Sequence, residues 1–283
     1  MSRLSHLPGT FDCMIERCFN CAPTPLDGSI EFLRKMPILE SIEGRIVWEA
    51  GRGILQAVPH AIKRRRFASF FGPSALSGNH AVAVLDPYTH PLPRVGNRYV
   101  KHFLGRRPDQ PLVGEDDVLG VNVVRIVAYI SALFSQFRSD RRSIPFVTDA
   151  AIANKWDSTF LCFGSSDSNV KTLDIESLPQ QTLYSFGFDP NGHRCFIAGG
   201  SVFASQPHKD YGMLLRLRNP YHQEHWLFIC AGLGEWGTSG SAYYLTDRWP
   251  QLHEQHRTSN FAKVIEVNLG SDESAREVYS AQA

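Results

Sequence analysis

The chain has 283 residues, 43% of them hydrophobic and 11% aromatic, so it can bury a sizeable core and is unlike a disordered chain. Its 29 Lys and Arg residues nearly balance 28 Asp and Glu residues, which argues against nucleic-acid binding through bulk positive charge. No basic and then apolar leader is present, and the apolar stretch 118–137 carries too many polar residues for a membrane span. We therefore expect a cytoplasmic protein that binds neither membrane nor nucleic acid.

The cysteines and histidines do not predict a metal site. The CxxC at 18–21 has no second pair, whereas a structural zinc site usually takes two. Cys162 and Cys230 lie inside apolar runs and are predicted to be reduced core residues. The HxxH at 222–225 falls just before a predicted strand, where a hairpin loop is the simpler interpretation. We expect no metal and no cofactor other than a bound ligand.

The first part of the chain predicts an irregular and helical extension. From 29 to about 66, apolar residues recur at spacings of three and four, as on one face of a helix, and Pro59 is expected to end or kink it. Residues 67–79 have the glycine, proline and serine content of a linker. We therefore predict an N-terminal extension over 1–78 and an α/β ligand-binding domain over 79–283.

A different pattern begins after the linker. Short, continuous apolar runs at 81–85, 144–147 and 159–163 are typical of strands buried on both faces of a sheet. Helical patterns at 118–137 and about 150–156 separate these runs. Strands that alternate with helices favour right-handed crossovers and a parallel sheet.

The last part of the chain predicts hairpins. The turn signal at 189–192, Asp-Pro-Asn-Gly, stands between two apolar runs. Two antiparallel pairs are expected, 183–186 with 195–198 and 211–217 with 226–231, followed by a helix through 242–245 and a strand at 262–267. The chain as a whole predicts an α/β fold with an open, mostly parallel sheet, β-hairpin additions and an N-terminal helical extension.

Two glycine-rich loops are the strongest candidate site. Each follows a predicted strand and precedes a helix, and ligands of open α/β sheets bind beyond the carboxyl ends of strands. Glycine lets a ligand approach the backbone, and amides and hydroxyls supply donors to an anion. The candidate ligand-binding residues are Gly164, Ser165, Ser166 and Asn169 in the first loop and Gly232, Gly234, Gly237 and Thr238 in the second.

Each loop also has a plain structural interpretation. Either can be a tight strand-to-helix turn in which Ser, Thr or Asn caps the helix. Gly232, Gly234 and Gly237 match the spacing of a dinucleotide fingerprint, but that fingerprint belongs to the first strand–helix unit of a fold, and here it comes late. The prediction is that both loops converge on one anion-accepting recess.

Three acids are weak candidates for catalysis. Asp86 ends the first predicted strand, although Asp86-Pro87 is also a common way to start a turn. Glu115 precedes the long helix, where an acid also complements the helix dipole. Glu235 lies within the second loop, where charge repulsion disfavours direct contact with phosphate.

The motifs over roughly 80–267 resemble a group of prokaryotic α/β proteins. The resemblance is carried by Gly164-Ser165-Ser166-Asp167-Ser168-Asn169 after a strand, Asp210-Tyr211-Gly212, Asn219-Pro220 and Ala231-Gly232 with Gly237-Thr238. The first motif departs from the Gly-Gly-Pro expected there. More distantly, the order is similar to Rossmannoid nucleotide-handling domains: Toll/interleukin-receptor-like (TIR-like), SLOG-like and nucleoside deoxyribosyltransferase domains. The resemblance implies a flavodoxin- or TIR-like sheet and an NAD-like or nucleotide-derived ligand, often in defence signalling.

Two functions follow as hypotheses. The first is a nucleotide-responsive module that binds an NAD-like or cyclic-nucleotide ligand; as an enzyme it would cleave an N-glycosidic bond, with a carboxylate stabilising the oxocarbenium-like centre. The second is a non-catalytic interaction or scaffold subunit, in which the loops are only turns. In either case the helical region 29–66 is the expected surface for a protein partner or for homo-oligomer formation.

Overall fold

The computed structural model describes residues 60–78, 80–85, 120–152, 154–190 and 192–283. All of these except His60 belong to one compact unit, Ala61–Ala283. The CxxC at 18–21, most of the predicted helical region 29–66, Asp86 and Glu115 lie outside the described residues.

The unit is built on a seven-stranded sheet with the order β10-β9-β7-β8-β3-β1-β2. Parallel pairing joins β2 to β1, β1 to β3 and β3 to β8, and antiparallel pairing joins β8 to β7, β7 to β9 and β9 to β10. Since β9 is antiparallel to β7, which is antiparallel to β8, five strands run one way and β7 and β10 run the other. The strands are β1 Ala81–Leu85, β2 Phe146–Thr148, β3 Thr159–Phe163, β7 Lys209–Arg218, β8 Trp226–Gly232, β9 Phe261–Asn268 and β10 Ser271–Gln282.

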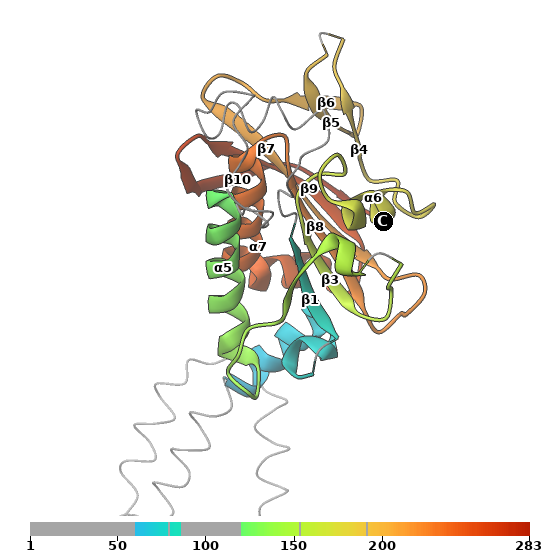
Figure 1. Ribbon diagram of the computed structural model, residues 1–283, viewed down its shortest axis with the longest axis vertical. Coiled ribbons are helices and arrows are strands. Elements are labelled where there is room, and N and C mark those ends of the chain that lie inside the picture. Colours follow the sequence, from blue (N-terminus) through green and yellow to red (C-terminus); the bar gives the residue numbers. More distant parts are fainter. Residues whose placement is uncertain (1–59, 79, 86–119, 153, 191) are drawn as a thin grey trace, which may run out of the picture. The chain divides into compact units, whose positions relative to one another are not determined.

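Helices cover both faces of this sheet, and the α/β class is confirmed. In Figure 1, α5 (Val121–Phe137) and α7 (Glu235–His256) lie on one face, and α6 (Val170–Glu176) lies on the other. The 3₁₀ helices η2 (Pro73–Leu76) and η3 (Asp149–Ile152) contribute to the first and second face, respectively, through buried Ala75 and Ile152. No helix within the described ranges is long and apolar enough to cross a membrane.

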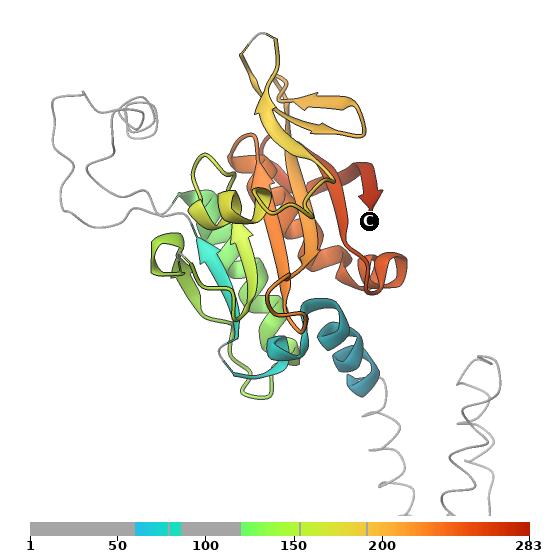
Figure 2. The same cartoon turned by 90° about the vertical axis from the view of Figure 1, so that its right-hand side faces the viewer.

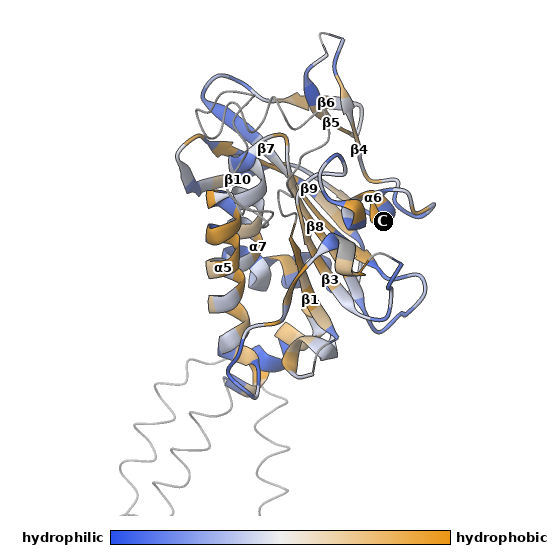
Figure 3. Cartoon of the chain, viewed as in Figure 1, coloured by the Kyte–Doolittle hydropathy of each residue, from blue (hydrophilic) through white to orange (hydrophobic). Residues whose placement is uncertain are grey.

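Burial on both faces explains the continuous apolar strands. Every residue of β1, β3 and β8 is buried, and alternate residues enter two separate hydrophobic clusters. Figure 3 accordingly colours these strands and much of α5 as apolar and the outer loops as hydrophilic. Strands β1 and β3 were predicted from this pattern with the observed bounds, and β8 was predicted at 226–231 as the partner of β7 in a hairpin. The run at 144–147 becomes a strand only from Phe146, and β2 is half-buried rather than buried.

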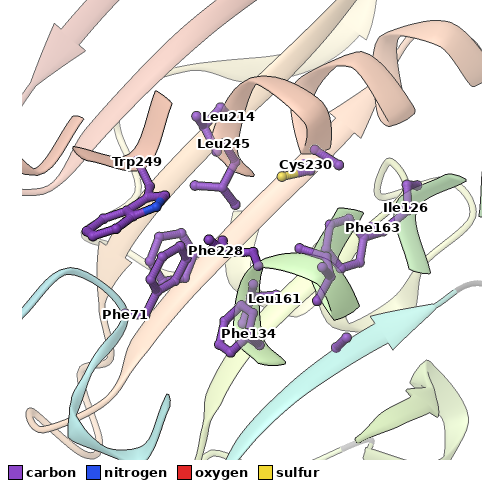
Figure 4. Packing of buried hydrophobic residues seen from close by; sticks show 14 of the residues in the cluster. Phe71, Ile126, Phe134, Leu161, Phe163, Leu214, Phe228, Cys230, Leu245 and Trp249 are labelled. Carbon is purple, nitrogen blue, oxygen red and sulfur yellow. The ribbon is translucent and has the colours of Figure 1, made fainter. Parts of the chain in front are cut away.

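The expected linker at 67–79 is only partly a linker. Residues 60–71 form a helix, and Phe67, Phe70 and Phe71, at spacings of three and four, are fully buried. Phe67 stacks on Phe137 of α5 with ring centroids 4.4 Å apart, and Figure 4 shows Phe71 and Trp249 in the same core. The helical spacing of these aromatic residues therefore indicates a helix up to residue 71, and the linker signals apply only to the glycine and proline that follow it.

A smaller three-stranded sheet stands beyond the main one, in yellow and light orange in Figure 2. It has the order β4-β5-β6, with β4 at Ser185–Phe188, β5 at Arg194–Ala198 and β6 at Ser201–Ala204. The hairpin predicted around 189–192 is confirmed, because β4 and β5 pair antiparallel across it. The sequence did not predict β6 or β10.

Candidate functional site

The structure brings the two glycine-rich loops to one edge of the sheet. Phe163, the last residue of β3, pairs with Cys230 of the parallel strand β8. The amide of Gly164 donates to the carbonyl of Cys230 at 3.1 Å. Both loops therefore begin at the carboxyl ends of neighbouring strands.

From this edge the two connections leave toward opposite faces. The β3 loop leads to α6, whose Ile175 enters the cluster on one face, whereas the β8 loop leads to α7, whose Leu245 enters the cluster on the other (Figure 1). Such a divergence between adjacent parallel strands is a topological switch point, the position outside the strand ends where ligands of open α/β sheets bind.

Asn169 caps α6 and joins two strands. Its side-chain oxygen accepts from the amide of Thr172 at 3.1 Å, and its amide group donates to the carbonyls of Phe163 at 3.1 Å and Val84 at 3.5 Å. The side chain is fully buried. Asn169 was a candidate ligand donor, and in the structure its donors and acceptor are engaged within the fold.

The serines of the first loop face charged side chains. The hydroxyl of Ser165 donates to Asp167, which also pairs with Arg194 of β5. Gly164 adopts a φ of 115°, which L side chains rarely adopt. The loop is therefore held by an ion pair to the small sheet.

Glu176, at the end of α6, faces the same loop. Its carboxylate accepts from the hydroxyl of Tyr184 at 2.6 Å, and the hydroxyl of Ser166 is also directed to it. Burial raises the pKa of Glu176 above its usual value, while these two hydroxyls oppose the rise. The sequence analysis missed Glu176 and Tyr184, since neither belongs to a motif.

The glycines of the second loop allow helix α7 to pack directly on the sheet. A Cβ on Gly232 would lie 2.2 Å from the amide nitrogen of Thr238, and one on Gly237 would lie 2.2 Å from the carbonyl oxygen of Tyr211. Thr238 itself is buried and donates both its amide, at 3.3 Å, and its hydroxyl, at 3.2 Å, to the carbonyl of Gly234. The glycines were expected to let a ligand approach the backbone, but here another part of the chain's own backbone lies in that space.

A carboxylate of the protein occupies the N-terminus of α7. Asp210, at the start of β7, accepts from the amide of Gly237 at 2.7 Å and from the hydroxyl of Ser205 at 2.9 Å, and the amide of Gly234 also stabilises its charge. Asp210 is 3% exposed, and burial raises its pKa against the effect of these donors. In the sequence, Asp210 belongs to Asp210-Tyr211-Gly212, one of the motifs that carry the resemblance, but it was not a candidate site residue.

Of the other residues that the sequence analysis weighed, Glu235 lies at this edge of the sheet and the two histidines of the HxxH lie at the opposite edge. Glu235 is the half-buried first residue of α7. His222 and His225 lie before β8, at the opposite edge, where Glu224 is 3.8 and 3.7 Å from them.

Within the described ranges, no group of three His, Cys, Asp or Glu side chains is arranged to hold a metal ion. Cys162 and Cys230 are buried, and burial raises the pKa of both thiols.

No protein-family model, curated protein or solved structure matches the chain.

Proposed function

We propose that this protein is a nucleotide-responsive module that binds an NAD-like or cyclic-nucleotide ligand at the carboxyl edge of β3 and β8. The observation that carries the proposal is the divergence of the two connections, with α6 on one face of the sheet and α7 on the other (Figure 1). In open α/β sheets this position is where ligands bind.

The side chains around this edge suit a ligand with several polar groups. Ser166 and Glu235 are half-buried rather than enclosed, and Arg194 of β5 retains 34% side-chain exposure. If the protein turns its ligand over, we propose hydrolysis of an N-glycosidic bond, in which a carboxylate such as that of Glu235 stabilises the oxocarbenium-like centre.

The resemblance extends the proposal beyond the site. It supports a Rossmannoid relationship and a role in prokaryotic defence signalling. A cytoplasmic location is part of the same proposal. Association with a second copy or a partner protein would then use residues 29–66.

The test is a thermal-shift and mass-spectrometric assay with NAD, ATP and cyclic AMP. A ligand at about 100 times its dissociation constant is expected to add about 2.7 kcal/mol to the free energy of unfolding. Ser166→Leu, which places bulk at the edge, should abolish the shift. Ser177→Leu, at the C-cap of α6, is the matched control and should keep it. No shift with any of the three ligands would contradict the proposal.

A specific observation favours the alternative of a non-catalytic interaction or scaffold subunit. Asp210 already accepts from the Gly237 amide, and Asp149 accepts from the first amide of α6, that of Val170, at 2.8 Å. Loops whose helix termini are satisfied internally can serve as turns alone. This alternative would be supported if the folded protein binds no nucleotide and associates through residues 29–66.

A further inference from the structure

Side chains from four parts of the chain meet beside the first glycine-rich loop. They come from the loop itself, the end of α6, the residue just before β4 and the start of β5. Ion pairing and hydrogen bonds connect them in two groups, one around Asp167 and one around Glu176. We call this set the Glu176 cluster: Ser165, Ser166, Asp167, Glu176, Tyr184 and Arg194.

The Glu176 cluster is rich in groups that pair with hydroxyls. It holds three hydroxyl groups, which both donate and accept, and two carboxyl groups, which accept when ionised. Glu176 is half-buried and accepts from the hydroxyls of Tyr184, at 2.6 Å, and of Ser166. A ligand hydroxyl, which donates and accepts at once, finds both kinds of partner here.

The charges around the two loops disfavour a phosphate. Four carboxyl groups contact the loops or the first turn of the helices that follow: Asp149 accepts from Val170, Asp167 from Ser165, Glu176 faces Ser166, and Asp210 accepts from Gly237. The guanidinium of Arg194, which contacts this set, is already paired with Asp167. The amides of Gly234 and Gly237, which would otherwise attract an anion, face Asp210.

We propose that the Glu176 cluster binds the sugar hydroxyls of the ligand, and that any phosphate of the ligand lies outside it. This inference rests on the proposed function and narrows it to ligands whose affinity comes from a nucleoside part. Arg194 is then a specificity-determining residue, because its guanidinium pairs with Asp167 and therefore does not bind a phosphate of the ligand.

The test compares nucleosides with their phosphates by isothermal titration calorimetry. Adenosine, guanosine, cytidine and uridine are each titrated beside their 5′-monophosphates, with inorganic phosphate as a competitor. We expect the binding nucleoside to match or exceed its monophosphate in affinity and inorganic phosphate not to displace it. A monophosphate that binds more than about tenfold tighter, or displacement by inorganic phosphate, overturns the inference and leaves the proposed function in place.

Two variants test the placement of the sugar. Ser166→Ala should weaken nucleoside binding by about tenfold, as expected for a lost hydrogen bond. Asp167→Asn frees Arg194 and should raise the affinity for the monophosphate relative to the nucleoside by about tenfold. Asp174→Asn, on α6 beside Lys171, is the matched control and should change neither.

The outcomes separate this inference from the proposed function. Nucleoside binding that is insensitive to both Ser166→Ala and Asp167→Asn would place the sugar elsewhere and overturn the inference alone. A folded protein that binds no nucleoside, no monophosphate and none of NAD, ATP and cyclic AMP would overturn both.

Discussion

Gly237 lies where no side chain fits. A Cβ there would be 2.2 Å from the carbonyl oxygen of Tyr211 and 3.0 Å from the Cα of Gly232, and both neighbours are backbone atoms of the sheet. We expect Gly237→Ala to lower the free energy of unfolding by roughly 1–3 kcal/mol, because helix α7 must move off the strands. Urea denaturation followed by circular dichroism measures this loss.

Gly187 supplies the control for that prediction. It lies in strand β4, and a Cβ there would meet nothing within 4 Å. Gly187→Ala should change the free energy of unfolding by no more than about 0.5 kcal/mol. If the two variants are equally stable, the glycines of the second loop do not serve helix packing.

At the same scale, the sequence predicted which residues gather at the edge better than what they do there. Asn169 caps α6, and Gly237 and Thr238 lie in the first turn of α7 rather than in the loop before it. The polar groups of all three are engaged within the chain. The residue types that bind anions at a helix N-terminus are the same types that cap it. Pattern alone cannot separate the two uses, because the deciding atoms belong to Asp210 and Asp149, which are distant in sequence.

At the scale of elements, β10 is tied to the helices on one face by a buried acid. Asp272 is 2% exposed; it accepts from the hydroxyls of Tyr129 at 2.9 Å and Ser239 at 2.6 Å, and it pairs with Arg125 at 2.9 Å. Removing one member of a buried ion pair leaves the other charge buried without a partner, which costs about 3–5 kcal/mol when both are enclosed. Arg125 retains 26% side-chain exposure, so water can partly replace the lost partner.

We therefore expect Asp272→Ala to lower the free energy of unfolding by roughly 2 kcal/mol. Hydrogen exchange should show the loss of protection concentrated in β10 and the adjacent strand β9. Glu273→Ala, at the exposed neighbouring position, should leave both measurements unchanged. Uniform loss of protection across the sheet would contradict a local role.

The element that the sequence missed is this same strand. Asp272 is the one buried residue of β10, and its other charged residues, Glu273, Arg276 and Glu277, are exposed. The strand therefore lacks the apolar run of β1, β3 and β8. It forms because β9 offers a paired edge along nearly its whole length, from Ser271 opposite Asn268 to Gln282 opposite Phe261. Such pairing between neighbours is a tertiary property rather than a local one.

At the scale of the whole molecule, two buried histidines and one half-buried histidine make stability depend on pH. Burial lowers the pKa of His225, His253 and His256 below 6.5 in the folded state. The unfolded chain then binds these protons more readily, so their contribution is complete above about pH 7 and is lost as the pH falls below the ordinary histidine pKa of about 6.5. The raised pKa values of Glu176 and Asp210 act in the opposite direction.

Replacing all three histidines by glutamine isolates their effect. The midpoint of urea denaturation of the natural protein should fall between pH 7 and about pH 5, and the triple variant should show a shallower fall over the same range. A fall of equal steepness in both proteins would mean that other groups govern the acid response.

The sequence by itself determined the α/β class, the strands of the parallel region, the first hairpin and the presence of two strand-to-helix loops. Each of these features depends on local periodicity and on turn residues, which can be recognised in the sequence. Only the tertiary structure decided that β3 and β8 are neighbours, that Asp210 occupies the N-terminus of α7, and that Glu176, Tyr184 and Arg194 gather beside Ser166. The physical reason is that chain folding, and not spacing along the chain, sets which carboxylate reaches which amide.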